Sequence, residues 1–201
     1  YARSKAVMEG VLADLADDRF QTTCLRFPTA CGMSPRLRLD LVLNDFVASA
    51  LTTGTIEILS DGTPWRPLID VADMGRSISW ALARNGESSV RVNVGRNEWN
   101  YQIAQVAEAV AARLPGTKVR VSPDAAPDKR SYRVDFRLFE SLAPDHLPQV
   151  PLEQSIDEVA AGLRAIDFQD ASFRTSRLIR LVALQKLRDA DHLDADLCWR
   201  R

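Results

Sequence analysis

The spacing of apolar residues alternates along this chain between the period of a helix and the short runs typical of a strand. Val7, Val11 and Leu15 recur at helical spacing and predict a first helix over residues 4–17. The apolar run 22–27 then predicts a short buried strand. The alternation continues along the chain, so we expect an α/β fold rather than an all-helical or all-strand one.

The same patterns predict the remaining elements. Further helices are expected at residues 40–51, 72–84, 101–114, 152–166 and 172–190, and further strands at 55–59, 68–71, 90–94 and 118–121. Loops or turns are expected at residues 28–32, 60–64 and 122–129, which are rich in proline, glycine and aspartate. We expect Asn100 to cap the helix at 101–114 and Asp73 to lie in the first turn of the helix at 72–84.

Composition limits the classes of function. The chain has 201 residues, 46% apolar and 26% charged, which is enough to bury a core of its own. It holds no long uncharged apolar run, so we expect no membrane partner. Its net charge of -1 gives no general attraction for nucleic acid, so we expect no nucleic-acid partner and look to local arginines for any anion binding.

Cysteine and histidine usage adds to these limits. Three cysteines in a chain without a secretory signal are typical of reduced thiols, so we expect a cytoplasmic protein. The two histidines, His146 and His192, lie far apart in the sequence. We therefore expect no metal site and no histidine-based catalytic triad.

The first five residues hold a candidate proton-transfer pair. Tyr1 and Lys5 are four residues apart, so on a helix they share one face. A nearby ammonium lowers the pKa of a phenol from about 10 toward neutrality, which makes the tyrosine a plausible general base. The same spacing is also typical of a solvated helix face, so the pair alone does not decide between the two interpretations.

Four segments follow Tyr1 and Lys5 in an order that resembles a known family. Residues 25–32 resemble the Arg-aromatic-x-Asn-x-Tyr-Gly segment of extended short-chain dehydrogenases/reductases. Residues 60–73 are similar to the Gly-Asp-Gly-x-x-x-Arg-x-x-x-His-Val-x-Asp block of that family, and residues 93–95 and 128–135 resemble its Asn-x-Gly and Arg-x-Tyr-x-x-Asp signatures. The resemblance runs from Tyr1 to about Ile166, and its nearest branch is the NAD-dependent epimerase/dehydratase family acting on nucleotide sugars.

This resemblance implies roles around a nicotinamide cofactor, NAD or NADP. Tyr1 would exchange a proton with a sugar hydroxyl while hydride moves between the sugar and the nicotinamide. Lys5 would bind the nicotinamide ribose and lower the tyrosine pKa, so both residues are catalytic and cofactor-binding candidates. Phe27 and Pro28 match positions that pack on the nicotinamide; the alternative is a strand end packed into the core.

The resemblance also implies a nucleotide-sugar substrate and a set of residues that bind it. The candidates are Thr29, Asp40, Leu41, Arg66 and Arg130. Arg66 is the best candidate for a diphosphate clamp because a guanidinium presents rigid donors to phosphate oxygens, although an arginine beside a tryptophan could equally cover the core. Asp40 could instead be the acidic N-cap of the helix that follows it.

The chain departs from the family pattern at several positions. Asp70, Thr29 and Cys31 stand where the pattern usually has histidine, asparagine and tyrosine, which puts the identity of the substrate in doubt. The 201 residues hold no glycine-rich dinucleotide loop, which the family carries upstream of the tyrosine. We therefore expect a C-terminal portion that starts at the catalytic tyrosine, and expect it to be inactive and poorly soluble when expressed alone.

These observations predict the C-terminal part of a Rossmann-type doubly wound parallel sheet together with a small α/β substrate-binding subdomain. Residues 1–33 would end the dinucleotide-binding domain, residues 34–170 would be mostly substrate-binding, and residues 171–201 would form a helical extension. That extension is basic and amphipathic, so it could touch a membrane surface or a partner, or simply dock on the body. By resemblance we expect a homodimer through the tyrosine-bearing helix.

Two functions remain open from the sequence. The first is an NAD(P)-dependent epimerase or dehydratase acting on a nucleotide sugar. The second is a noncatalytic sugar-nucleotide-binding or protein-binding member of the same fold. Tyr1 together with Lys5 favours the enzyme.

Overall fold

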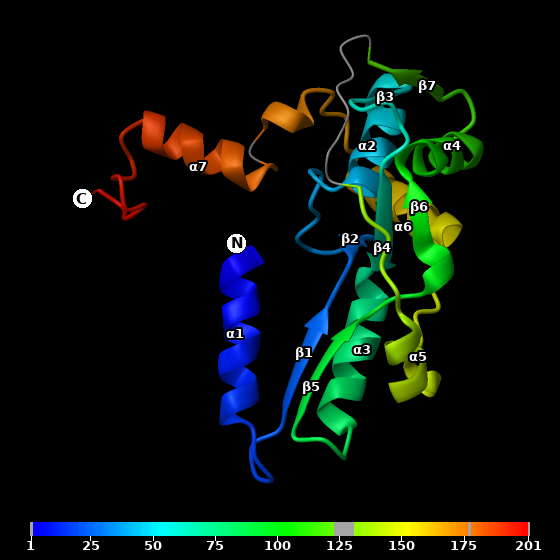
Figure 1. Ribbon diagram of the computed structural model, residues 1–201. Coiled ribbons are helices and arrows are strands. Elements are labelled where there is room, and N and C mark those ends of the chain that lie inside the picture. Colours follow the sequence, from blue (N-terminus) through cyan, green and yellow to red (C-terminus); the bar gives the residue numbers. More distant parts are fainter. Residues whose placement is uncertain (1, 123–130, 177, 201) are drawn as a thin grey trace.

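The computed structural model describes residues 2–122, 131–176 and 178–200 and has α/β architecture (Figure 1). The α-helices are α1 (Ala2–Leu15), α2 (Val42–Thr53), α3 (Val71–Ala83), α4 (Ile103–Arg113), α5 (Arg137–Leu142), α6 (Leu152–Ala165) and α7 (Arg180–Asp189). The strands are β1 (Thr22–Arg26), β2 (Thr29–Cys31), β3 (Thr55–Ile58), β4 (Trp65–Asp70), β5 (Ser89–Asn93), β6 (Asn100–Gln102) and β7 (Lys118–Val121). Short 3-10 turns occupy Asn97–Trp99, Pro144–His146 and Phe173–Thr175.

Most strand pairs are parallel, as a chain of alternating helices and strands requires. β1 pairs with β5, β2 with β4, and β3 with β7, all in parallel register, while β6 joins the edge of β4 antiparallel. Parallel neighbours need a crossover connection, which is usually a helix. The predicted α/β fold class is therefore confirmed.

Two separate clusters of buried side chains hold the chain together. The larger core lies among α2, α4 and α6 and the strands β3 and β4, with Leu43, Val106 and Ile156 fully buried. The smaller core lies among α3, β5 and α5, where Trp80 and Phe139 meet edge to face with ring centroids 5.4 Å apart. In Figure 1 the smaller core belongs to the lower half of the molecule, which also carries α1 and β1.

The start of α4 differs from the prediction that Asn100 caps it. Asn100 belongs to β6, where it faces Pro67 of β4, because strand pairing takes the residues before the helix. Gln102 is the N-cap instead, and it forms a capping box with Gln105, whose side chain accepts the Gln102 N–H at 2.8 Å. The Asn100 amide bonds to the 134 backbone, which holds a distant segment against β6.

Three other elements differ from the predictions. Residues 29–31, expected as a loop, form β2, since they pair with β4. The short helix α5 was not predicted. The helix predicted over 172–190 is a 3-10 turn at Phe173–Thr175 followed by α7, and Lys186 Nζ donates to the Thr175 carbonyl at 2.8 Å across this break.

The prediction that Asp73 lies in the first turn of α3 is confirmed. Its carboxylate is fully buried and accepts the backbone N–H groups of Gln149 and Val150, each at 2.9 Å. Arg76 Nε donates to the same carboxylate at 3.2 Å. Asp73 therefore ties the segment that leads into α6 to the start of α3.

Within the part of the chain that the structure describes, α1 and α7 bury none of their residues. The predicted apolar stripe of α1 is more than half exposed at Val7, Val11 and Leu15. Figure 1 shows α7 extending away from the body of the molecule. Across the described ranges, every helix is too short or too polar to cross a membrane.

Candidate functional site

A cavity of about 730 Å³ lies where most of the predicted substrate-binding residues meet. Its lining residues are Thr29, Asp40, Leu41, Val42, Asp45, Phe46, Glu57, Leu59, Ser60, Arg66, Ile103, Tyr132 and Arg174. Four of the five predicted substrate-binding residues are in this set, namely Thr29, Asp40, Leu41 and Arg66. The fifth, Arg130, lies outside the described residues. Motif positions that are far apart in sequence therefore meet at one cavity.

Strand pairing places Thr29 and Arg66 on the cavity. Thr29 opens β2 and lies opposite Leu68 of β4, and Arg66 lies two residues earlier on β4. Because side chains alternate along a strand, Arg66 and Leu68 share a face of β4. The short strand β2, which the sequence did not predict, is thus what brings Thr29 to the same cavity as Arg66.

Arg66 is held in place by its neighbours on two elements. Its Nη1 donates to the Trp65 carbonyl at 2.8 Å, and its guanidinium lies 5.6 Å from the centroid of the Tyr132 ring. Such a cation–ring contact orients the planar guanidinium without consuming its donors. Arg133 lies over the Trp65 ring at 4.6 Å, so the 131–133 segment covers this tryptophan. The structure favours a cavity-lining role for Arg66 over the alternative of covering the core.

Asp40 does not cap α2, which was the alternative interpretation of this residue. The helix begins at Val42, and its N-cap position is Leu41, which makes no side-chain capping bond. Asp40 instead pairs with Arg38 at 2.5 Å, and hydrogen bonding from that guanidinium lowers the pKa of the Asp40 carboxyl. Asp40 is therefore ionised and paired at the edge of the cavity.

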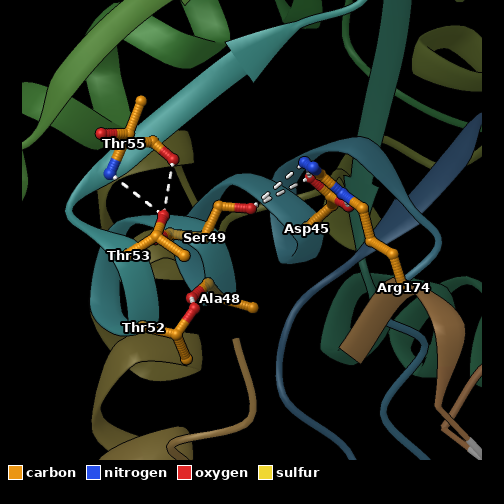
Figure 2. A network of polar contacts seen from close by, with 7 residues as sticks. All are labelled: Asp45, Ala48, Ser49, Thr52, Thr53, Thr55 and Arg174. Carbon is orange, nitrogen blue, oxygen red and sulfur yellow. Dashed lines mark hydrogen bonds and ion pairs between the residues drawn. The ribbon is translucent and has the colours of Figure 1, made fainter. Parts of the chain in front are cut away.

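A contact at the cavity, which the sequence did not reveal, joins the C-terminal segment, residues 172–176, to α2 (Figure 2). Arg174 Nε donates to Asp45 Oδ2 at 2.7 Å, and Arg174 Nη2 donates to Asp45 Oδ1 at 2.5 Å and to Ser49 Oγ at 3.2 Å. The hydrogen bonds that Arg174 donates to the Asp45 carboxylate raise the pKa of the Arg174 guanidinium above its usual value. Arg174 thus adds a second cation to the cavity lining.

The cofactor candidates lie elsewhere. Tyr1 is outside the described residues, and Lys5 is on the exposed face of α1. Phe27 and Pro28 follow β1 directly and are half-buried, and Phe27 packs against the smaller core. α1 packs on β1 and β5, so Lys5 and Phe27 come from adjacent elements. None of these described candidates lines the cavity, which separates them from the substrate candidates.

The departures from the family pattern at Asp70 and Cys31 lie off this cavity. Asp70 is the N-cap of α3, where it accepts the Ala72 N–H at 2.9 Å, and it also accepts the Ser155 hydroxyl at 2.7 Å. Gly32, with φ of +100°, packs so close that an added Cβ would lie 2.4 Å from the Asp70 carboxylate. Burial raises the pKa of the Cys31 thiol to about 12. Asp70 thus caps α3, and Cys31 belongs to the larger core.

Asp70 gives a pH-dependent prediction. Burial raises the pKa of its carboxyl above 3.8, with Glu158 and Asp73 adding to the effect, so the folded state binds more protons than the unfolded state just above that pH. Its contribution to the free energy of unfolding therefore falls as pH rises from about 4 through the raised pKa. Asp70→Asn keeps an oxygen for the Ala72 cap but does not titrate. We expect the stability of wild type relative to Asp70→Asn to fall with rising pH in urea unfolding; a constant difference would contradict this.

Within the described ranges, no group of three or more histidine, cysteine or acidic side chains could hold a metal ion. The charged groups of the cavity are the carboxylates of Asp40, Asp45 and Glu57 and the guanidinium groups of Arg66 and Arg174. This lining can hold an anion through the arginines and can accept hydrogen bonds from hydroxyl groups through the carboxylates. The lining therefore suits a ligand that carries both a negatively charged group and hydroxyl groups.

Comparison with solved structures agrees with this fold. UDP-glucose 4-epimerase from Bifidobacterium longum, in complex with NAD+ and UDP, matches with a TM-score of 0.66 at 16% identity, over 82% of this chain and 54% of that one. RMD from Pseudomonas aeruginosa, complexed with NADPH, matches with a TM-score of 0.68 at 15% identity, over 83% of this chain and 56% of that one. The UDP-Glc/GlcNAc 4-epimerase from Campylobacter jejuni matches with a TM-score of 0.62 at 23% identity, over 82% and 55%. The chain thus spans about half the length of the structures it matches.

The model of the family described as "NAD dependent epimerase/dehydratase family" matches residues 1–95. This range contains β1 to β5 and four of the substrate-binding candidates that line the cavity. It ends before the C-terminal segment that supplies Arg174. The first 95 residues of the chain are thus similar to the NAD dependent epimerase/dehydratase family, and the whole chain shares a Rossmann-like α/β fold with solved epimerases.

Proposed function

We propose that the full-length protein is an NAD(P)-dependent epimerase or dehydratase acting on a nucleotide sugar, and that the cavity holds the substrate. The observation that carries this proposal is that Thr29, Asp40, Leu41 and Arg66, taken from separate family motifs, line one cavity. A cavity of about 730 Å³ is in the range that holds a small organic ligand. The structures of relatives with NAD, NADPH or UDP support the choice of ligands.

In this proposal each part of the cavity has a separate task. The Arg66 guanidinium binds the diphosphate, because its fixed fork of donors matches phosphate oxygens. Thr29 and Asp40 lie on the same lining and bind hydroxyl or amide groups of the ligand through their side-chain oxygens. The substrate is thereby oriented before any chemistry occurs, which is a large part of what a site contributes to rate.

The candidates for the proton and hydride step are Tyr1, Lys5 of α1, and the two residues that follow β1. Lys5 offers a cation for ribose hydroxyls, and Phe27 and Pro28 offer an apolar surface for a nicotinamide ring, so these residue types fit the nicotinamide end of NAD(P). When bound, NAD(P) supplies the hydride acceptor and donor. Tyr1 takes the proton from the sugar hydroxyl during oxidation and returns one during reduction.

The same proposal divides the chain by task. Residues 1–33 belong to the cofactor-binding domain, residues 34–170 mostly bind the substrate, and residues 171–201 form a helical extension whose Arg174 lines the cavity. Because the 201 residues hold no glycine-rich dinucleotide loop and span about half of their relatives, we propose that they turn over only within the full-length protein. We further propose a homodimer through the exposed stripe of α1 and a cytoplasmic location consistent with three free cysteines.

The proposal is tested by turnover of the full-length protein. NADH absorbance is followed with a panel of nucleotide sugars, and the sugar products are analysed. Hydride transfer or sugar conversion with one member of the panel would support the enzyme and name its substrate. Tight binding of a nucleotide sugar with no conversion would favour the second candidate, a noncatalytic binding protein of the same fold.

Arg66→Gln gives a separate prediction for binding. Removing the guanidinium is expected to weaken binding of the nucleotide sugar by about 10- to 100-fold, since charge-assisted hydrogen bonds contribute roughly 1.5 to 3 kcal/mol. Isothermal titration of the full-length protein measures this loss. Arg188→Gln, which removes an exposed arginine of α7, is the charge-matched control and should bind as wild type does. Equal affinities for Arg66→Gln and wild type would place the diphosphate elsewhere.

A further inference from the structure

We propose that Arg174, from the C-terminal segment, is a second anion-recognising residue of the cavity and contacts the substrate's diphosphate together with Arg66. The inference rests on the proposed function and adds a specificity-determining residue to it. Arg174 lies well beyond residues 1–95, so the family match does not assign it. It reaches the cavity only because the C-terminal segment folds back over α2 (Figure 2).

The C-terminal segment is anchored next to the cavity by a buried ring. Phe173 is 2% exposed, belongs to the larger core, and meets Phe168 edge to face with ring centroids 6.1 Å apart. The Ser176 N–H donates to the Phe173 carbonyl at 3.1 Å and closes a turn around the next two residues. Arg174 is thus presented from a fixed backbone position rather than from the end of a loose tail.

The guanidinium of Arg174 keeps donors for a ligand. Nε and Nη2 are used for Asp45 and Ser49. Within the described residues Nη1 makes no hydrogen bond, so its two N–H groups can meet an oxygen that enters the cavity. The side chain of Arg174 is 39% exposed and that of Asp45 16%, so the guanidinium is the more accessible partner of the pair.

Arg174 also offsets negative charge in the cavity. Three carboxylates line it, and an unpaired carboxylate near a diphosphate costs binding energy. Arg38 pairs with Asp40, and Arg174 pairs with Asp45. Arg174 therefore neutralises Asp45 in the cavity lining and also offers donors to a diphosphate that enters the cavity. The phosphate oxygens can share Arg174 with Asp45, or replace Asp45 as the acceptor of its hydrogen bonds.

A purely structural role makes a different prediction. If Arg174 only docks the C-terminal segment through its ion pair with Asp45, removing either partner breaks the pair. A second substitution on the other partner then changes nothing further. If Arg174 contacts the diphosphate, its loss weakens binding even where Asp45 no longer pairs with it. The Asp45→Asn background separates the two roles.

The experiment titrates UDP-glucose, and the other nucleotide sugars of the panel, into the full-length protein and its variants. The variants are Asp45→Asn, Arg174→Gln, the double substitution, Arg66→Gln as reference and Arg188→Gln as control. We expect Arg174→Gln to weaken binding at least about 10-fold in both backgrounds, because a charge-assisted bond is lost each time. Arg174→Lys should retain part of the affinity through its charge. Thermal unfolding of each variant confirms that it is folded.

The outcomes are distinct. A double variant that binds as tightly as Asp45→Asn would overturn the role of Arg174, while a loss of binding in Arg66→Gln would still support the proposed function. A folded wild type that binds no nucleotide sugar would overturn both. A loss at Arg174 in both backgrounds, with Arg188→Gln unchanged, would establish Arg174 as a residue that recognises the ligand.

Discussion

Tyr1→Phe is expected to reduce the rate of hydride transfer by the full-length protein by about 1,000-fold, the middle of the range for a lost general acid–base group. The substitution removes only the hydroxyl that exchanges a proton with the sugar, so binding of NAD(P) and of the nucleotide sugar should be almost unchanged. Steady-state turnover with the substrate found in the panel, together with titrations of both ligands, measures this difference between rate and binding.

Two further variants make the result specific to the Tyr1 hydroxyl. Tyr101→Phe removes a hydroxyl from a half-buried tyrosine packed against the larger core and should leave the rate within about 2-fold of wild type. Lys5→Met removes the cation expected to lower the Tyr1 pKa, so the basic form of the tyrosine should appear only at higher pH in the pH–rate profile. A Tyr1→Phe variant with wild-type turnover would mean that this pair is a solvated helix face.

Asp73→Leu is expected to lower the free energy of unfolding by about 3 to 5 kcal/mol, the cost of breaking a buried charged network. The carboxylate is fully buried and accepts the N–H groups of Gln149 and Val150 and the Nε–H of Arg76. Leucine accepts none of these bonds, so two backbone donors and a guanidinium lose their partner. Urea unfolding measures the loss.

The matched control for Asp73 is Asp157, which pairs with Arg113 on the surface. Asp157→Leu should cost at most about 1 kcal/mol, because exposed ion pairs contribute little. Asp73→Asn should fall between the two, since its single carbonyl oxygen can keep one backbone bond. If Asp73→Leu and Asp157→Leu cost the same, the 147–151 segment does not depend on this carboxylate for its position.

The sequence predicted the elements whose apolar residues recur at a clear spacing, and the site residues that lie within family motifs. β1 and α6 follow from their apolar patterns, and Arg66 and Thr29 were placed in one site from motif order alone. The substrate candidates were accessible to sequence reasoning because each lies next to a strand or helix end that the motif itself specifies.

The elements and contacts that the sequence did not predict share a physical cause: they depend on pairing between distant segments and leave no local sequence pattern. β6 takes Asn100 out of its expected capping role because it pairs with β4, and β2 exists only through its contact with the same strand. α5 has six residues, too few to show a helical period. Arg174 lies 129 residues from Asp45, and no pattern near either residue indicates that they meet.

The central claim is that the cavity lined by Thr29 and Arg66 is the nucleotide-sugar site, and hydrogen–deuterium exchange tests it most directly. The full-length protein is compared with and without each nucleotide sugar that it binds. The account predicts slower exchange in residues 57–66 and 172–176, which border the cavity. Saturating nucleotide sugar with unchanged exchange in both segments, and protection elsewhere, would contradict it.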